Sequence, residues 1–102
     1  MEDMDSMVME LIVNAGEGRS LAIQAIREAR AGRFEEAESL LEECNEALIR
    51  CHHSQTELIQ AELQGTGVPV TLLMVHAQDH IMNAMTVKDL AAELVATLKE
   101  KM

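Results

Sequence analysis

The stretch Gly65-Thr66-Gly67-Val68-Pro69 is the clearest loop signal in this sequence of 102 residues, because it holds two of the five glycines and the only proline. Apolar residues recur at helical spacing on both sides of it, so the loop separates two long helices and reverses the chain between them. Pro69 fits the first turn of the following helix, which we expect from about Val70 to Lys99. Lys99 and Lys101 suit the C-terminus of that helix.

Two further helices are expected before the loop. The nearer one runs from about 34 to 63, and the other from about 5 to 31, where Gly32 would end it as a C-cap glycine. Small residues dominate the middle of the first helix, so a second helix can approach it closely there. Its apolar stripe, which is close to a heptad, passes through Val8, Leu11, Ala15, Gly18, Ala22, Ile26 and Ala29. The sequence therefore predicts one all-α domain over residues 1–102, an antiparallel up-down-up three-helix bundle.

The composition agrees with packed helices and excludes several classes of function. Aliphatic residues and eight methionines must form the core, because the chain is 48% hydrophobic but only 1% aromatic. The formal net charge of −10 argues against binding to nucleic acid. No segment approaches the roughly 20 apolar residues of a membrane span, and the acidic N-terminus is unlike a signal peptide. We therefore expect a cytoplasmic protein without direct membrane insertion.

Three polar or thiol side chains fall on the apolar stripe of the second helix. Cys44 and Cys51 would lie ~10 Å apart along the helix axis, given the rise per residue, which is beyond the ~7 Å limit for a disulfide. We interpret both as small buried hydrophobic residues. Gln55 interrupts the stripe where a leucine is expected, so we predict that its side chain hydrogen-bonds inside the bundle.

The third helix carries the segment His76-Ala77-Gln78-Asp79-His80 among apolar residues. Its two imidazoles and its aspartate stand at i, i+3 and i+4, so they project from one broad side. Asp79 lies on a near-heptad line, where a lone polar residue commonly fixes the register and oligomeric state of a helix seam. If identical helices met about a symmetry axis, several Asp79 carboxylates would converge and would repel each other unless a divalent cation lay between them. The line comprises Leu72, Val75, Asp79, Met82, Thr86 and Glu93.

His76 lies beside this line, at an accessible rim, where a neutral imidazole is a good nucleophile. Spacing alone leaves other functions open. In one, the segment is structural and the protein is a non-catalytic helical adaptor. In another, His76 and His80 bind zinc, although Ala77 stands where the zincin helix has its general-base glutamate.

The segment from Leu73 to Met82 resembles the signature of the lactose/cellobiose-type IIA proteins of the bacterial phosphotransferase system. Those proteins usually read V-H-A-Q-D-H-L-M-T, whereas this chain has Ile81 and Asn83 in place of the leucine and the threonine. Further matches are the segments 11–16 and 19–22, and His52, Gln55, Thr56, Leu58 and Ile59. The resemblance spans nearly the whole chain.

The resemblance implies a role for each matching residue. His76 would take a phosphoryl group on Nε2 from the phosphocarrier HPr and pass it to a cysteine of the cognate IIB protein, which serves the membrane protein IIC. The family forms a homotrimer, a nine-helix bundle, in which Asp79 would hold a divalent metal ion, Mg²⁺ in our expectation, on the three-fold axis. Gln78, His80 and Gln55 would support the phosphorylation site.

Two points stay open at this stage. The sugar is bound by IIC, so lactose, cellobiose and chitobiose systems are all compatible with the sequence. No arginine or lysine lies near His76 along the chain, and we therefore hypothesise that the partner proteins supply the basic groups that stabilise the phosphoryl group.

Overall fold

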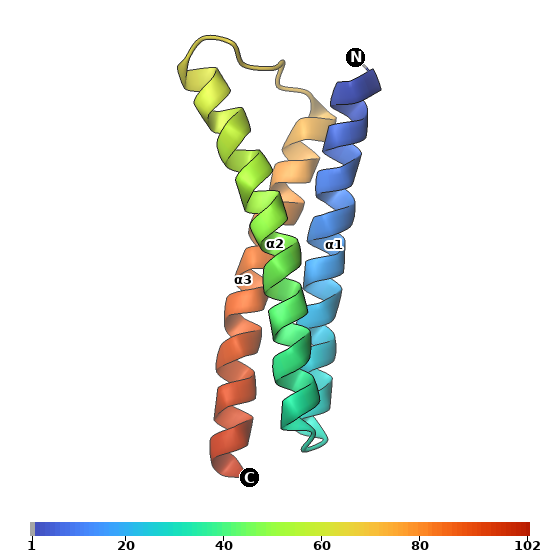
Figure 1. Cartoon of the computed structure of the whole chain (residues 1–102), viewed down its shortest axis with the longest axis vertical. Coiled ribbons are helices and arrows are strands. Elements are labelled where there is room, and N and C mark those ends of the chain that lie inside the picture. Colours follow the sequence, from blue (N-terminus) through green and yellow to red (C-terminus); the bar gives the residue numbers. More distant parts are fainter. Residues whose placement is uncertain (1) are drawn as a thin grey trace.

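The structure, a computed structural model, describes the backbone of residues 2–102 and the side chains of residues 5–102. It consists of three long antiparallel helices, and the described residues contain no strand (Figure 1). The helices are α1 (Glu2–Arg30), α2 (Phe34–Leu63) and α3 (Leu72–Lys101). The predicted all-α, up-down-up bundle is confirmed. Over the described residues, no helix is both long and apolar enough to cross a membrane.

Local signals explain where the helices end. α2 has the predicted bounds, and α1 ends at Arg30, one residue before the predicted position and two residues before Gly32 with its left-handed φ of +84°. The predicted start of α3 was wrong by two residues. Thr71 is its N-cap, since Oγ1 of Thr71 accepts a hydrogen bond of 3.1 Å from the backbone N–H of Met74. Pro69 therefore lies in the loop, outside the first helical turn.

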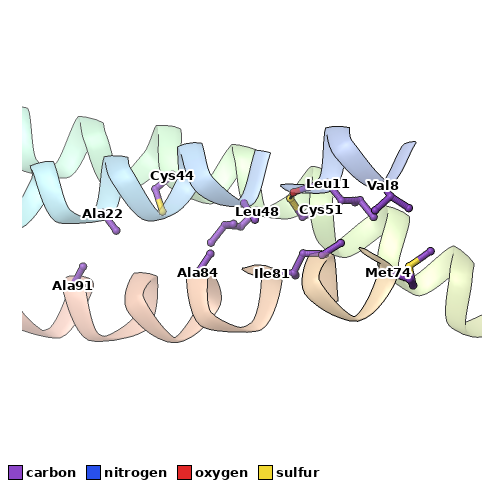
Figure 2. Close-up of a cluster of buried hydrophobic side chains, with 12 residues drawn as sticks. Val8, Leu11, Ala22, Cys44, Leu48, Cys51, Met74, Ile81, Ala84 and Ala91 are labelled. Carbon is purple, nitrogen blue, oxygen red and sulfur yellow. Dashed lines mark hydrogen bonds between the residues drawn. The ribbon is translucent and has the colours of Figure 1, made fainter. Parts of the chain in front are cut away.

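Small residues let α1 pack closely against both other helices, as predicted. The β-carbon of an alanine at position 18 would lie only 2.7 Å from Cδ2 of Leu48 on α2. The largest fully buried side chains are those of Ile81, Cys44 and Cys51 (Figure 2). Both cysteines are free and buried, as the interpretation of small hydrophobic residues requires, and burial raises the pKa of both thiols.

α2 and α3 contact each other much less than either contacts α1. Figure 1 shows the cause, because the C-terminal part of α2 diverges from the other two helices toward the loop. This divergence leaves a hollow of about 270 Å³ between α2, the loop and the start of α3.

The third helix has two apolar faces. One is buried in the bundle and comprises Met74, Ala77, Ile81, Ala84, Ala91 and Val95. The near-heptad line around Asp79 forms the other face and points to solvent. Its apolar members are exposed, with fractions of 86% for Leu72, 51% for Val75 and 52% for Met82. We call this face, which is Leu72, Val75, Asp79, Met82, Thr86 and Glu93, the outer face of α3.

Candidate functional site

The two histidines of α3 contact each other. Nε2 of His80 lies 3.1 Å from Nε2 of His76, and the two rings are nearly perpendicular, with centroids 4.4 Å apart. One ring must therefore present an N–H and the other a lone pair. His76 is exposed and His80 is half-buried. If His80 donates, Nε2 of His76 carries a lone pair and its own proton sits on Nδ1.

Gln55 and Gln78 form a second polar pair, which links α2 to α3. Nε2 of Gln55 donates to Oε1 of Gln78 over 2.8 Å, and both side chains are half-buried. The predicted hydrogen bond of Gln55 inside the bundle is thus confirmed. The pair lines the 270 Å³ hollow, whereas His76 faces a different hollow beside Leu72. Within one chain, the structure does not bring this pair to the histidines.

The two polar pairs lie on opposite flanks of the outer face of α3. At 100° per residue, His76 and His80 are on the flank toward α1, and Gln78 is on the flank toward α2. Asp79 lies between the two flanks and is exposed. The one helix thus carries three separate polar features: a histidine pair, a carboxylate and an amide pair.

Within residues 5–102, no group of three or more histidine, cysteine, aspartate or glutamate side chains is placed to hold a metal ion. His76 and His80 would give a zinc ion two imidazoles from one chain. A metal ion on a symmetry axis would take one Asp79 carboxylate from each of several chains. Carboxylate oxygens suit a hard divalent ion such as Mg²⁺, so the donor type fits the expected metal.

No role was predicted from the sequence for Arg19, although this residue belongs to the matching segment 19–22; the structure brings it to the histidine flank. Arg19 of α1 lines a surface hollow together with His80, Asn83, Thr86 and Val87 of α3. Its position could have been predicted from the sequence, because residue 19 directly follows Gly18 of the buried stripe and therefore lies at the edge of the face of α1 that packs in the bundle. Arg19 thus shares a hollow with His80, the ring that contacts His76, whereas His76 itself borders a separate hollow with Leu72 and Leu73.

Comparisons with known proteins agree on one family. The family described as "PTS system, Lactose/Cellobiose specific IIA subunit" matches residues 6–99. The lichenan-specific phosphotransferase enzyme IIA component of Bacillus subtilis (strain 168) is 52% identical over 94 residues, which are 92% of this chain and 86% of that protein.

Two solved structures extend the likeness to the fold. The crystal structure of the cellobiose-specific enzyme IIA from Bacillus anthracis has a TM-score of 0.89 and 43% identity, covering 93% of this chain and 87% of that one. The IIA(Chitobiose)–HPr complex of Escherichia coli, a solution structure, has a TM-score of 0.81 and 35% identity. It covers 94% of this chain and 93% of that one.

Proposed function

The chain belongs to the lactose/cellobiose-specific IIA family of the phosphotransferase system, and from this membership we propose that it carries a phosphoryl group on Nε2 of His76. It accepts the group from phosphorylated HPr and passes it to a cysteine of its cognate IIB protein. IIB in turn serves the membrane protein IIC during sugar uptake. The protein is thus a transferase component that works in the cytoplasm.

One observation carries the proposal: His76 is exposed, and its Nε2 lies 3.1 Å from Nε2 of His80. An exposed imidazole is accessible to a protein partner, and the His80 ring lies at hydrogen-bonding distance from its Nε2. HPr as the donor is supported by the similar IIA(Chitobiose) protein, whose solution structure is a complex with HPr.

The transfer needs two displacements at phosphorus. In the first, the Nε2 lone pair of His76 forms the new P–N bond while the bond from phosphorus to HPr breaks, and HPr keeps that electron pair. In the second, a thiolate of IIB forms a P–S bond while the P–N bond to His76 breaks. Such transfers depend mostly on positioning and on stabilising the charge of the phosphoryl oxygens.

His80 is suited to support both states of His76. Its Nε2–H would donate to the lone pair of His76 before transfer, which keeps the proton of His76 on Nδ1; this bond breaks as phosphorus approaches, and the Nε2 lone pair becomes free to attack. After transfer, the same N–H would donate to a phosphoryl oxygen. The Nε2 to Nε2 distance of 3.1 Å permits the first of these bonds directly.

We also propose the homotrimer, with the outer face of α3 as its seam. Exposed leucine, valine and methionine side chains need cover, and three copies would join Leu72, Val75 and Met82 about one axis. The Asp79 carboxylates would then converge and hold a divalent metal ion, Mg²⁺ by its preference for oxygen ligands. Rotation about that axis would also turn the Gln55–Gln78 flank of one copy toward the His76 flank of the next. This arrangement gives the amide pair its supporting role.

The phosphorelay tests the proposal directly. Phosphoenolpyruvate, Enzyme I and HPr are mixed with the protein, and the intact mass is measured before and after acid treatment. We expect one added phosphoryl group that acid removes. His76→Gln should keep the helical fold, because His76 is exposed, and should gain no mass.

The same experiment distinguishes the alternatives. A helical adaptor would gain no mass in the wild type, and a zinc protein would be purified with stoichiometric zinc. A phosphorylated His76→Gln variant would move the acceptor to another histidine.

A further inference from the structure

A surface hollow of about 390 Å³ lies between α1 and α3, lined by Arg19, His80, Asn83, Thr86 and Val87. It adjoins the proposed site, since Nε2 of His80 is 3.1 Å from Nε2 of His76. We infer that this hollow receives the oxygens of the phosphoryl group on His76, and that the guanidinium of Arg19 binds them. This inference rests on the proposed phosphorylation of His76.

The direction of the new bond places the phosphoryl group on this side of α3. Phosphorus must approach Nε2 of His76 along its lone pair, in the ring plane. Nε2 of His80 lies at hydrogen-bonding distance from that same atom. The incoming group therefore replaces the contact between the two rings and comes to lie beside His80, which forms one wall of the hollow.

The charges around the hollow favour an anion there. The chain has a formal net charge of −10, yet no carboxylate is among the residues that line this hollow. Three other basic side chains, those of Arg33, Lys88 and Lys99, each pair with an acidic residue, whereas Arg19 is one of five that do not among the described residues. Among the side chains of residues 5–102, Arg19 has no carboxylate within ion-pairing distance, so its guanidinium is available.

Two further donors line the hollow, and their availability differs. The Thr86 hydroxyl donates to the backbone carbonyl of Met82 over 3.1 Å, so its proton is already used. The Asn83 amide makes no hydrogen bond to any side chain or backbone group among the described residues. Asn83 can therefore donate an N–H to a phosphoryl oxygen beside Arg19, where the family's usual residue is a threonine.

An arginine side chain is well suited to bind the oxygens of a phosphoryl group. Its planar fork of N–H donors matches two phosphate oxygens at once, and it stays charged at every relevant pH. During transfer, negative charge is spread over the equatorial oxygens of the phosphoryl group. Arg19 stabilises that charge without gaining or losing a proton. The basic group thus comes from the same chain and not only from the partners, which revises the hypothesis made from the sequence.

The test compares two arginines of α1. Arg19→Gln removes the charge from the hollow, while Arg30→Gln removes the same charge at the exposed end of the helix, away from His76. The rate constant of transfer from phosphorylated HPr is measured for each variant by intact mass in quenched time points. We expect Arg19→Gln to lower it roughly tenfold, the effect of one hydrogen bond to a charged group, and Arg30→Gln to change it less than twofold.

A second measurement detects the contact itself. The phosphorus-31 chemical shift of the phosphohistidine should change in Arg19→Gln and stay unchanged in Arg30→Gln. Arg19→Lys, which keeps the charge but loses the fork, should transfer faster than Arg19→Gln and still shift the phosphorus signal. If Arg19→Gln does not fold, the test uses the phosphorus signal of Arg19→Lys instead. A signal shifted from that of the wild type supports the contact between Arg19 and the phosphoryl group, and an unchanged signal refutes that contact.

The outcomes separate the inference from its premise. If the wild type takes no phosphoryl group from HPr, the proposed function is refuted. A wild type that is phosphorylated, together with equal rates and unchanged phosphorus signals in the variants of Arg19 and Arg30, would refute the role of Arg19 alone. Equal slowing in Arg19→Gln and Arg30→Gln would also refute it, because only long-range charge would then matter.

Discussion

The substitution Gly18→Ala tests how closely α1 and α2 approach each other. The added β-carbon would lie 2.7 Å from Cδ2 and 2.9 Å from Cγ of Leu48. Leu48 is only 2% exposed and borders a surface hollow of about 260 Å³, so its packed side chain would have to shift to relieve the contact. Gly16, two residues earlier on the same helix, is exposed, and a β-carbon there would have no heavy atom within 4 Å. Gly16→Ala is therefore the matched control.

Two opposing effects determine the expected change in the free energy of unfolding. An extra methyl group in a packed core destabilises by ~1–3 kcal/mol, and alanine in place of glycine inside a helix stabilises by ~0.8–1 kcal/mol. Gly16→Ala receives only the second effect and should raise the free energy of unfolding. Gly18→Ala receives both, so its net change should be a destabilisation of up to ~2 kcal/mol. The difference between the two variants, ~1–3 kcal/mol, isolates the steric cost.

Urea unfolding followed by circular dichroism gives this difference. Both variants are measured at one protein concentration, because an oligomer makes apparent stability depend on concentration. The urea dependence should match that of the wild type, so that a shifted midpoint reports stability. If the two variants differed by less than ~0.5 kcal/mol, the range of ordinary surface substitutions, the close packing of Gly18 on Leu48 would be refuted.

Three further predictions concern the loop, the outer face and the core. Thr71→Ala removes the N-cap of α3 and should lower the free energy of unfolding by ~1 kcal/mol; an unchanged urea midpoint would contradict the cap. Asp79→Leu exchanges a charge in the proposed seam for an apolar side chain, so the proposed trimer should form and be at least as stable in sedimentation; a wild-type trimer that is lost in this variant would show that the Asp79 carboxylates are needed for assembly. Burial raises the pKa of the Cys44 and Cys51 thiols, so iodoacetamide at pH 8 should alkylate them much more slowly in native protein than in urea. Equal alkylation rates in the two conditions would mean that the thiols are accessible.

The sequence was sufficient for features that depend on local signals. The bounds of α2 follow from its apolar period and from Gly32, which needs a left-handed backbone conformation. The start of α3 was misplaced because Pro69 and Thr71 both signal a helix start. The hydrogen bond that Thr71 Oγ1 accepts from the backbone N–H of Met74 prevailed over the fixed φ of proline.

Features that depend on contacts between helices could not be read in the same way. α3 has two apolar faces, and periodicity does not say which of them packs on α1; the structure buries Ile81 and leaves Val75 half exposed. Arg19 and His80 are far apart along the chain and line the same hollow only because α1 and α3 pack side by side. The position of the histidine pair on one helix, by contrast, was set by a spacing of four residues.

The divergence of α2 from the other helices affects how the bundle opens. The last turn of α2 lies where this helix diverges from the other two, and Leu63 there is 82% exposed. Its amide hydrogens should therefore exchange with solvent deuterium through local fraying, long before those beside Ile81, which require global unfolding. The end of the molecule that carries the 64–71 connection is thus its least cooperative part. Local opening around this connection should therefore leave the packing around Ile81 intact.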